Sequence, residues 1–518
     1  MSTYYVENFG CRATQADGAD LERQFEQRGL SRASTLAQAS VVVMNTCTVT
    51  AAADQDARAA IRRVRRQNPE AQIVVTGCYA QRAPKEIAAL PGVSLVVGNS
   101  HKHKLAEIVT QTQASDLGPP TSNTAFVPLA MLHTISSSNL PAETEPSHRN
   151  PEARSPRSEV RSFVSDIFAH TELQAAPVFD VTDGNENART RPTLKVQDGC
   201  DNRCSFCVIP YVRGQSRSLP MDRILSEVNA LVKANYREVV ISGINLGRWG
   251  RDLDLSSQRS VLGMSGSMLG QRPRTNDQRL PSLIRVILAN TTLQKLRISS
   301  VEPMDWTDDL ISLVASSPRI AKHAHVPLQS ASDAVLRRMH RKYRPWHYRE
   351  KIEKIRAAMP TAAIGADVMV GFPGETDADF EATRRMIDEL PFTYLHVFTY
   401  SPRPGTPAAS LTNQVPVHVA RERNRILREL SAEKKHAFMR IFIGKELEAI
   451  TLNVVGTDAT GEFTEALTDN YLKLRLEGRH KANRWMGARV DGVEGGVLVG
   501  QETISTYRDG RSGLEGAS

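Results

Sequence analysis

The sequence predicts an α/β protein with an N-terminal parallel-sheet domain, a partial (β/α) barrel and a small C-terminal β-barrel. Strand and helix patterns alternate over residues 1–110 and again over 191–418, and short strands with alternating apolar residues fill 443–505. Between the first two parts, residues 111–190 are rich in Pro, Ser, Thr and Asn. Such a composition buries too little apolar surface to fold, so we expect a disordered linker there.

In the first part, a cysteine follows each of three predicted strands. "TYYVENFG", "SVVVMNTCTV" and "IVVTGC" are apolar enough to be short buried strands, and helical stretches with one apolar side separate them. Cys11, Cys47 and Cys78 stand at the strand ends, where open parallel sheets bind ligands. A single buried cysteine is often only a core residue, so each one alone could be inert. Together, three cysteines at one sheet edge favour a shared ligand site.

The second part repeats a strand followed by a polar or Gly/Pro-rich turn. The segments with this pattern are "REVVISGINLG", "KLRISSVEP", "HAHVPLQS", "IGADVMVGFPGE" and "YLHVFTYSPRPGT". Repeated β/α units predict a full or partial barrel whose active site lies at the carboxyl ends of the strands. Residues 255–281 interrupt the pattern, and we expect a surface-loop insertion there.

A helix and a small β-domain are predicted after the barrel. Residues 419–442 have the pattern of a basic amphipathic helix. Its inward side chains are expected to be Ile426, Leu427, Leu430, Phe438 and Ile441. Beyond this helix, "YLKLRLEG" places Leu472, Leu474 and Leu476 on one face of a strand, and residues 506–518 are expected to be a frayed tail.

The sequence argues against a membrane-spanning protein and against a secreted one. Hydrophobic residues make up 40% and charged residues 24% of the 518 positions, and no apolar run approaches the ~20 residues of a membrane span. The N-terminus has no basic region followed by an apolar segment, so we expect no signal peptide and a cytoplasmic location. Cysteines there serve more often as metal ligands or catalytic groups than as disulfides. A formal charge of +8 favours an anionic partner such as nucleic acid, although many basic proteins bind none.

Three further cysteines lie within eight positions. The segment "DGCDNRCSFCVIP", residues 198–210, contains the spacing C-x3-C-x2-C. Zinc sites favour four protein ligands, whereas only three are present locally, and a disulfide would leave one thiol over. Thiolates also suit iron–sulfur clusters, and three of them on a four-iron cluster leave one iron open. This last interpretation fits the spacing best.

The loop resembles that of the radical S-adenosylmethionine (SAM) superfamily, in which C-x3-C-x2-C holds a 4Fe–4S cluster. The resemblance implies that Cys200, Cys204 and Cys207 are the catalytic cluster ligands and that SAM binds the open iron and is cleaved to a radical. Phe206 stands where the superfamily places an aromatic residue. Further cofactor contacts implied by the resemblance are Gly243, Asn245, Ser300, Glu302 and Arg213.

Several of these polar residues have equally simple alternative roles. Gly243, Asn245, Ser300 and Glu302 could be ordinary turn or surface residues. Arg213 and Arg217 could meet the SAM carboxylate or an RNA phosphate, or form a salt bridge within the loop. His325 and Gln329 end another predicted strand, where they could line the pocket or be structural. Lys434, Lys435 and Arg440, on the basic helix, could contact phosphates or simply face water.

Longer motifs resemble the methylthiotransferases, a radical SAM family that adds methylthio groups to tRNA or to a ribosomal protein. The matching segments are "GCRATQADG", "MNTCTVT", "TGCYAQ", "GCDNRCSFCVIPYVRGQSRS", "HVPLQSASDAVLRRMHRKY" and "YSPRPGTPAA". The resemblance implies a second 4Fe–4S cluster on Cys11, Cys47 and Cys78 and a TRAM domain that holds RNA. It makes all six cysteines metal ligands.

The resemblance also implies a reaction and partners. The branch most similar to this chain acts on C2 of N6-threonylcarbamoyladenosine at position 37 of a tRNA anticodon loop. The isopentenyladenosine branch is the first alternative, a ribosomal-protein aspartate is the second, and a non-enzymatic RNA-binding protein with zinc sites is a rival from another class. We expect SAM and two 4Fe–4S clusters as cofactors, tRNA and a low-potential electron donor such as flavodoxin or ferredoxin as partners, no membrane contact, and a monomer.

Overall fold

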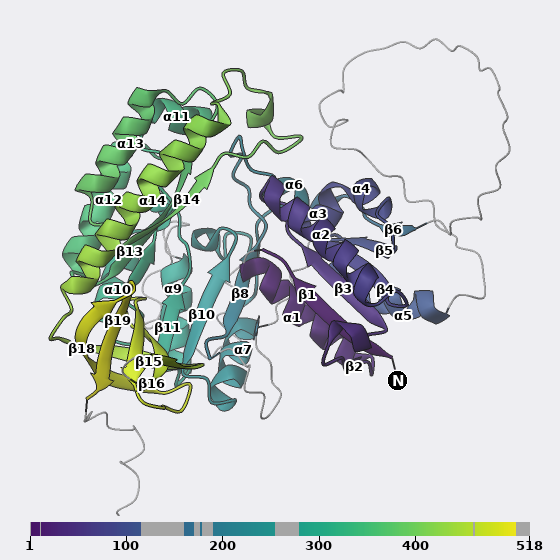
Figure 1. Ribbon diagram of the computed structural model, residues 1–518, viewed down its shortest axis with the longest axis horizontal. Helices are drawn as coiled ribbons and strands as arrows, with labels where there is room; N and C mark the ends of the chain where they lie inside the picture. Colours follow the sequence, from purple (N-terminus) through teal and green to yellow (C-terminus); the bar gives the residue numbers. More distant parts are fainter. Residues whose placement is uncertain are drawn as a thin grey trace, which may run out of the picture.

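The fold has three sheet systems that follow one another along the chain (Figure 1). The computed structural model describes residues 2–10, 12–114, 160–169, 177–178, 190–253, 279–458 and 461–503. None of the helices in these ranges has the length and apolar character that crossing a membrane requires. The predicted α/β class, with a parallel-sheet domain, a partial barrel and a closed C-terminal barrel, is confirmed.

The N-terminal sheet is entirely parallel, as predicted. Its strands, in sheet order, are β2 (Ser31–Arg32), β1 (Thr3–Asn8), β3 (Val41–Thr46), β4 (Gln72–Gly77), β5 (Val93–Gly98) and β6 (Arg161–Phe163). The helices between them are α1 (Arg12–Gln27), α2 (Ala51–Gln67), α3 (Cys78–Arg82), α4 (Pro84–Ala88) and α5 (Leu105–Ala114). Helices α1 and α5 cover one face, while α2, α3 and α4 cover the other. Strand β3 is buried at every position because it lies between these two helix layers.

Two short strands lie inside the range predicted as a linker. Strand β6 pairs with β5 and extends the N-terminal sheet, and β7 (Pro177–Val178) pairs antiparallel with the first strand of the barrel. Helix α5 also continues four residues past position 110. The expected linker therefore contains regular structure at these places, and most of 111–190 lies outside the described residues.

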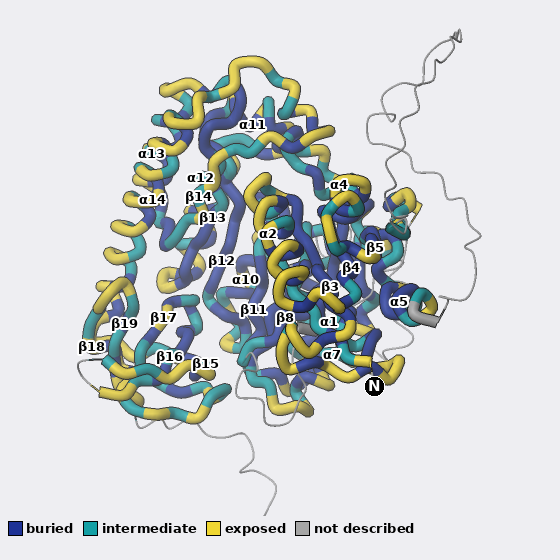
Figure 2. Tube along the Cα trace, turned by 45° about the vertical axis from the view of Figure 1, so that its right-hand side comes forward, coloured by how far each residue is buried: buried dark blue, intermediate teal, exposed yellow. Residues whose placement is uncertain are grey.

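The central part is a partial barrel of parallel strands. Its strands are β8 (Thr193–Asp198), β10 (Glu238–Gly243), β11 (Lys295–Ile298), β12 (His323–His325), β13 (Ala363–Val370) and β14 (Tyr394–Thr399), with β9 (Arg217–Ser218) antiparallel to β8. Its helices are α6 (Ile209–Arg213), α7 (Met221–Lys233), α9 (Arg279–Asn290), α10 (Asp308–Ser316), α11 (Asp333–Arg338), α12 (Pro345–Ala358) and α13 (Asp377–Glu389). A bridge between Leu296 and Ile320, and a hydrogen bond of 3.1 Å from Val301 N to His325 O, join β11 to β12. In Figure 2, strands β12 and β13 are largely buried, whereas helices α13 and α14 at the outside of the molecule have exposed stretches.

Two boundaries around the partial barrel differ from those predicted. Helix α9 begins at Arg279, within the predicted loop 255–281, whose residues 255–278 lie outside the described residues. The basic helix, α14, spans Val417–Arg440 rather than 419–442. Leu427 is fully buried as expected, but Ile441 is 46% exposed because it follows the end of the helix and no longer lies on its apolar side.

The C-terminal strands close into a small barrel. Their order is β15 (Glu446–Asp458), β16 (Gly461–Thr468), β17 (Lys473–Glu477), β19 (Val497–Glu502) and β18 (Trp485–Glu494). Leu472, Leu474 and Leu476 lie in its core, which confirms the alternation read from the sequence. Arg297, buried in β11, donates to Asp469 O at 3.1 Å and ties this barrel to the central part.

Candidate active site

The C-x3-C-x2-C loop connects β8 to α6, at the carboxyl end of the first barrel strand. Gln197, fully buried, donates to the backbone oxygens of Asp198 and Gly199 at 2.9 and 2.8 Å and so shapes the start of the loop. Gly199 has φ of +71°, and a Cβ there would lie 1.9 Å from Gln215 O. Only glycine fits this close approach, which brings Cys200 N to 3.1 Å from Gly214 O.

The three thiols of this loop lie together in a partly buried place. They form no disulfide with one another, and Cys207 N donates to Cys204 O at 3.1 Å. Burial, with a smaller effect of the neighbouring Cys204, raises the pKa of the Cys207 thiol to about 12 and also raises the pKa of Cys200. These thiols are protonated at neutral pH, so a metal centre would have to displace their protons on binding.

A charged pair borders the same loop. Arg341 Nη1 donates to Cys204 Sγ at 3.3 Å, and its Nη2 forms an ion pair with Glu302. Burial alone would lower the pKa of Arg341, but Tyr343, Glu302 and Cys204 raise it well above its usual value, so Arg341 stays cationic. These residues border a small pocket, lined also by Asn202. The sequence predicted Glu302 but not Arg341, although Arg341 lies within a quoted motif.

Asn245 supplies the clearest sign of a ligand contact. Its Nδ2 lies 3.6 Å from Cys200 Sγ, and its backbone N donates to Gln197 Oε1 at 2.7 Å. Its Oδ1 is buried and has no hydrogen-bond partner within the described part of the chain. Because a buried acceptor is normally paired, this atom fits a ligand that brings a donor. Three thiols, a cation beside one of them and an orphaned acceptor fit a three-thiolate cluster with a polar cofactor.

The other predicted cofactor contacts lie around this group without direct geometric support. Gly243 ends β10, where a Cβ would lie 2.8 Å from Gln197 Oε1. Ser300 is half-buried two residues after β11. Phe206 packs edge-on against Phe372, with ring centroids 6.5 Å apart, and so anchors the loop in an apolar cluster. Their cofactor contacts stay predictions.

The role predicted for Arg213 is corrected by the structure. Its guanidinium is 2% exposed and pairs with Asp198 Oδ1 and Oδ2 at 3.0 Å and with Asp17 Oδ2 at 2.8 Å. Its Nη1 and Nη2 therefore donate to carboxylates, which is the salt-bridge alternative and not the predicted cofactor contact. Arg217, which donates to Arg213 O at 2.7 Å, lies beside it.

Arg213 belongs to a buried set of charges between the N-terminal domain and the barrel. This interface charge network consists of Asp17, Lys102, Lys195, Asp198 and Arg213. Burial alone would raise the pKa of Asp17, but Arg213, Lys102 and Lys195 hold it well below its usual value. The network fixes α1, which begins after Cys11, against the barrel strand that leads into the C-x3-C-x2-C loop.

The N-terminal thiols also converge. Thr46 and Gly77 are register partners at the ends of β3 and β4, so Cys47 and Cys78 follow at adjacent places on the sheet edge. A Cβ on Gly10 would lie 2.5 Å from Cys47 Cβ, which places the chain just before Cys11 against the same thiol. Cys11 itself lies outside the described residues. The described geometry agrees with a shared site at this edge.

The two thiol sets are connected by a shared packing contact, the wall formed by Cys78, Val208 and Val212. Cys78 packs with Val208 and Val212, which belong to α6 and the turn before it, directly after Cys207. Asn99 Nδ2 lies 3.5 Å from Cys78 Sγ and donates to Val212 O at 2.7 Å. One amide therefore contacts both the N-terminal thiol site and the helix that follows the barrel thiols.

The remaining predicted residues are distributed over two places. Lys434 Nζ donates to Asp388 O and Lys435 Nζ to Gly496 O, so both lysines hold carbonyls of neighbouring elements. His325 lies inside the partial barrel with Asp367 and His396, and ligand atoms of these three residues lie within 4.8 Å of one another, as in a metal site. The sequence did not single out Asp367 or His396, because only the strand register brings them together.

Known protein families, relatives and structures are similar to parts or most of this chain. Residues 3–98 match the family described as "Uncharacterized protein family UPF0004", and residues 194–387 match the "Radical SAM superfamily". A tRNA-2-methylthio-N(6)-dimethylallyladenosine synthase of Endomicrobium trichonymphae is 30% identical, covering 92% of this chain and 94% of that protein. The radical S-adenosylmethionine methyltransferase TsrM of Kitasatospora setae has a TM-score of 0.48 and 15% identity, covering 79% of this chain and 74% of that one.

A further relative decides the family. The threonylcarbamoyladenosine tRNA methylthiotransferase MtaB of Aquifex aeolicus is 33% identical over 472 residues, which cover 91% of this chain and 96% of the relative. The likeness thus includes both thiol-bearing parts and extends over nearly all of both proteins. The chain belongs to the radical SAM methylthiotransferase family, in its MtaB-like branch.

Proposed function

We propose that this chain is a tRNA methylthiotransferase that adds a methylthio group to C2 of N6-threonylcarbamoyladenosine 37. The observation that carries the proposal is the wall shared by the two thiol sets, since Cys78 packs directly against the helix that follows Cys207. A radical SAM enzyme needs one cluster to cleave SAM. A second thiol site packed against the helix that follows the first supports insertion of sulfur as the further step.

In this proposal each thiol set holds one 4Fe–4S cluster. Cys200, Cys204 and Cys207 hold the cluster that binds SAM, and Cys11, Cys47 and Cys78 hold the second. When bound, the clusters and SAM supply the radical, the sulfur and the methyl group for an unactivated carbon–hydrogen bond.

The chain's other residues bind and orient the cofactor. Asn245 offers its buried Oδ1 to a donor on the cofactor, and Glu302 offers a carboxylate at the pocket. Arg341, held cationic between Glu302 and Cys204, offsets the negative charge of a thiolate-ligated cluster. Phe206, Gly243 and Ser300 complete the wall of the site.

The target base comes from an unpaired loop, which a protein can splay into a pocket at modest cost. We assign residues 443–505 to holding the tRNA, 191–418 to SAM cleavage and 1–110 to the second cluster. A low-potential donor such as flavodoxin or ferredoxin reduces the clusters, and the protein works in the cytoplasm as a monomer. The dimethylallyladenosine reaction is the second candidate, because a relative of that name is 30% identical.

Nucleoside mass spectrometry of tRNA from a deletion strain tests the proposal. The methylthio derivative of threonylcarbamoyladenosine should disappear, and the wild-type chain should restore it whereas Cys200→Ala should not. Loss of the methylthio-dimethylallyl nucleoside instead would favour the second candidate. Anaerobically prepared protein should contain about eight irons per chain, from two four-iron clusters. Zinc in their place would support the non-enzymatic alternative.

A further inference from the structure

The inner face of the partial barrel carries a group of histidine and aromatic side chains that have no role in the reaction described above. Along β12, β13 and β14 the side chains alternate between the two faces of the sheet. Ala324, Ala366 and Val397 pack towards the helices with the apolar core. The residues of the inner face are His323, His325, Asp367, Met369, Tyr394, His396 and Phe398. No residue of these three strands is Lys or Arg.

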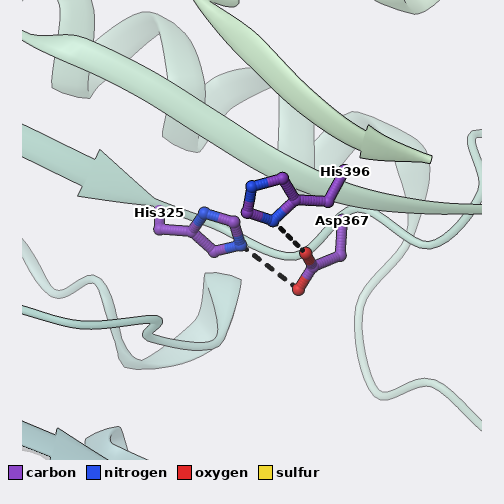
Figure 3. A group of neighbouring side chains, drawn as sticks. All are labelled: His325, Asp367 and His396. Atoms are coloured by element: carbon purple, nitrogen blue, oxygen red, sulfur yellow. Dashed lines mark hydrogen bonds and ion pairs between the residues drawn. The ribbon is translucent and has the colours of Figure 1, made fainter. Parts of the chain in front are cut away.

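Asp367 holds two imidazoles on this face (Figure 3). His325 Nε2 lies 3.2 Å from Asp367 Oδ2, and His396 Nδ1 lies 3.3 Å from Asp367 Oδ1. Burial alone would raise the pKa of Asp367, but hydrogen bonds from both histidines lower it below its usual range. The carboxylate is therefore ionised and accepts from both rings. These groups satisfy one another without a metal ion.

The two histidines differ in whether their second ring nitrogen has a hydrogen-bond partner. The His325 side chain is 9% exposed, and its Nδ1 is hydrogen-bonded to the Tyr394 hydroxyl at 3.0 Å. His396 is 55% exposed, and its Nε2 has no hydrogen-bond partner among the residues the structure describes. Figure 3 shows this second nitrogen directed away from Asp367. His396 thus presents one open nitrogen on a ring whose orientation Asp367 fixes.

The open nitrogen lies between the thiol sites and the C-terminal barrel. Beyond the carboxyl end of β14, Ser401 Oγ accepts from Ala51 N at 3.2 Å, four residues after Cys47. At the other end, the Tyr394 ring lies 5.9 Å from that of Tyr471 in the C-terminal barrel. C2 and the carbon that bears N6 are separate positions of one adenine ring. With C2 at the clusters, a substituent on N6 that extends towards the C-terminal barrel lies along the inner face.

We propose that His396, oriented by Asp367, contacts the carboxylate-bearing substituent on N6 of the target adenosine and selects it over an apolar one. This inference rests on the proposed function. Because His396 Nδ1 donates to Asp367, Nε2 donates to an anion in a charge-assisted hydrogen bond when the ring carries a proton on both nitrogens. The three strands supply no lysine or arginine for this contact. An apolar substituent would desolvate the open nitrogen of His396 without giving it a hydrogen-bond partner. A site built for a hydrogen bond rejects an analogue without it more strongly than an apolar pocket rejects an extra group.

Binding of anticodon stem-loop RNA to the reconstituted holoenzyme tests this role. Three RNAs are compared, with threonylcarbamoyladenosine, dimethylallyladenosine or unmodified adenosine at the target position. Wild type should prefer the first, and His396→Leu should lower this preference by about tenfold or more, as expected for a hydrogen bond to a charged group. Affinity for the unmodified RNA should stay within about twofold. His396→Gln, which keeps an N–H donor, should restore part of the preference.

Phe398→Leu is the matched control, since Phe398 shares the inner face but offers no hydrogen bond. It should change affinity for all three RNAs alike. A His396→Leu protein that still prefers the threonylcarbamoyl RNA as strongly as wild type overturns the inference and leaves the proposed function intact. A wild type that binds all three RNAs equally and makes no methylthio product from the first overturns the proposed function itself.

Discussion

Replacing Asp17 with Asn should loosen the contact between the N-terminal domain and the barrel. The Asp17 side chain is 4% exposed and pairs with Lys102 Nζ at 3.0 Å, Arg213 Nη2 at 2.8 Å and Lys195 Nζ. The interface charge network contains three cations and two carboxylates, so Asp17→Asn leaves three cations and one carboxylate. Removing one partner of a buried ion pair costs about 3–5 kcal/mol.

Amide hydrogen exchange measures this loss where it occurs. The amides of α1 that exchange by opening of the interface should exchange roughly 100-fold to 5,000-fold faster, since 1.36 kcal/mol corresponds to a factor of ten. Asp20→Asn, one turn along the same helix, is the matched control. Burial raises the pKa of Asp20, and a neutral Asn can keep its bond to Gln24 Nε2, so little change is expected. Equal exchange in both variants would refute the idea that the network holds the two parts together.

Three further results are expected. The carboxylates of the interface charge network have pKa values below their usual range. The stabilisation that they give the fold is therefore complete above about pH 4 and is lost as the pH falls further. The Tm measured by circular dichroism should fall more between pH 7 and pH 3 for wild type than for Asp17→Asn. Gly10→Ala would place a Cβ 2.5 Å from Cys47 Cβ, so iron content should fall from about eight to about four per chain. Gly29→Ala, which has a similar positive φ of +77° but open space, should keep its iron. Leu427→Ala should lower the free energy of unfolding in urea by about 2–5 kcal/mol, whereas Ile441→Ala should change it by less than about 0.5 kcal/mol; equal losses would contradict the observed end of α14.

What the sequence predicts well is what depends on local pattern. The alternation of Leu472, Leu474 and Leu476 places them in the barrel core because side chains on a strand alternate between its faces. The spacing of Cys200, Cys204 and Cys207 likewise puts three thiols on one loop, whatever surrounds them.

What it does not predict depends on partners distant in the chain. Arg213 pairs with Asp17, 196 positions away, and nothing local distinguishes that pairing from a cofactor contact. Arg341 is 137 positions from Cys204, and only the folded barrel brings them together. The end of α14 was misplaced by two residues because the apolar spacing continues to Ile441 after the helix has stopped.

The N-terminal domain and the barrel are joined by Asn99 and by the interface charge network. These contacts bear on whether the two parts could be separated from one another. Three cations of the barrel, Lys195, Arg213 and Arg403, find buried counter-charges in the N-terminal domain, where Arg403 Nη2 lies 2.5 Å from Asp54 Oδ2. A barrel separated from that domain would expose these charges to one another and to water at the edge of its cofactor loop. The two parts are therefore not expected to be exchangeable as independent modules between proteins, because each completes buried ion pairs of the other.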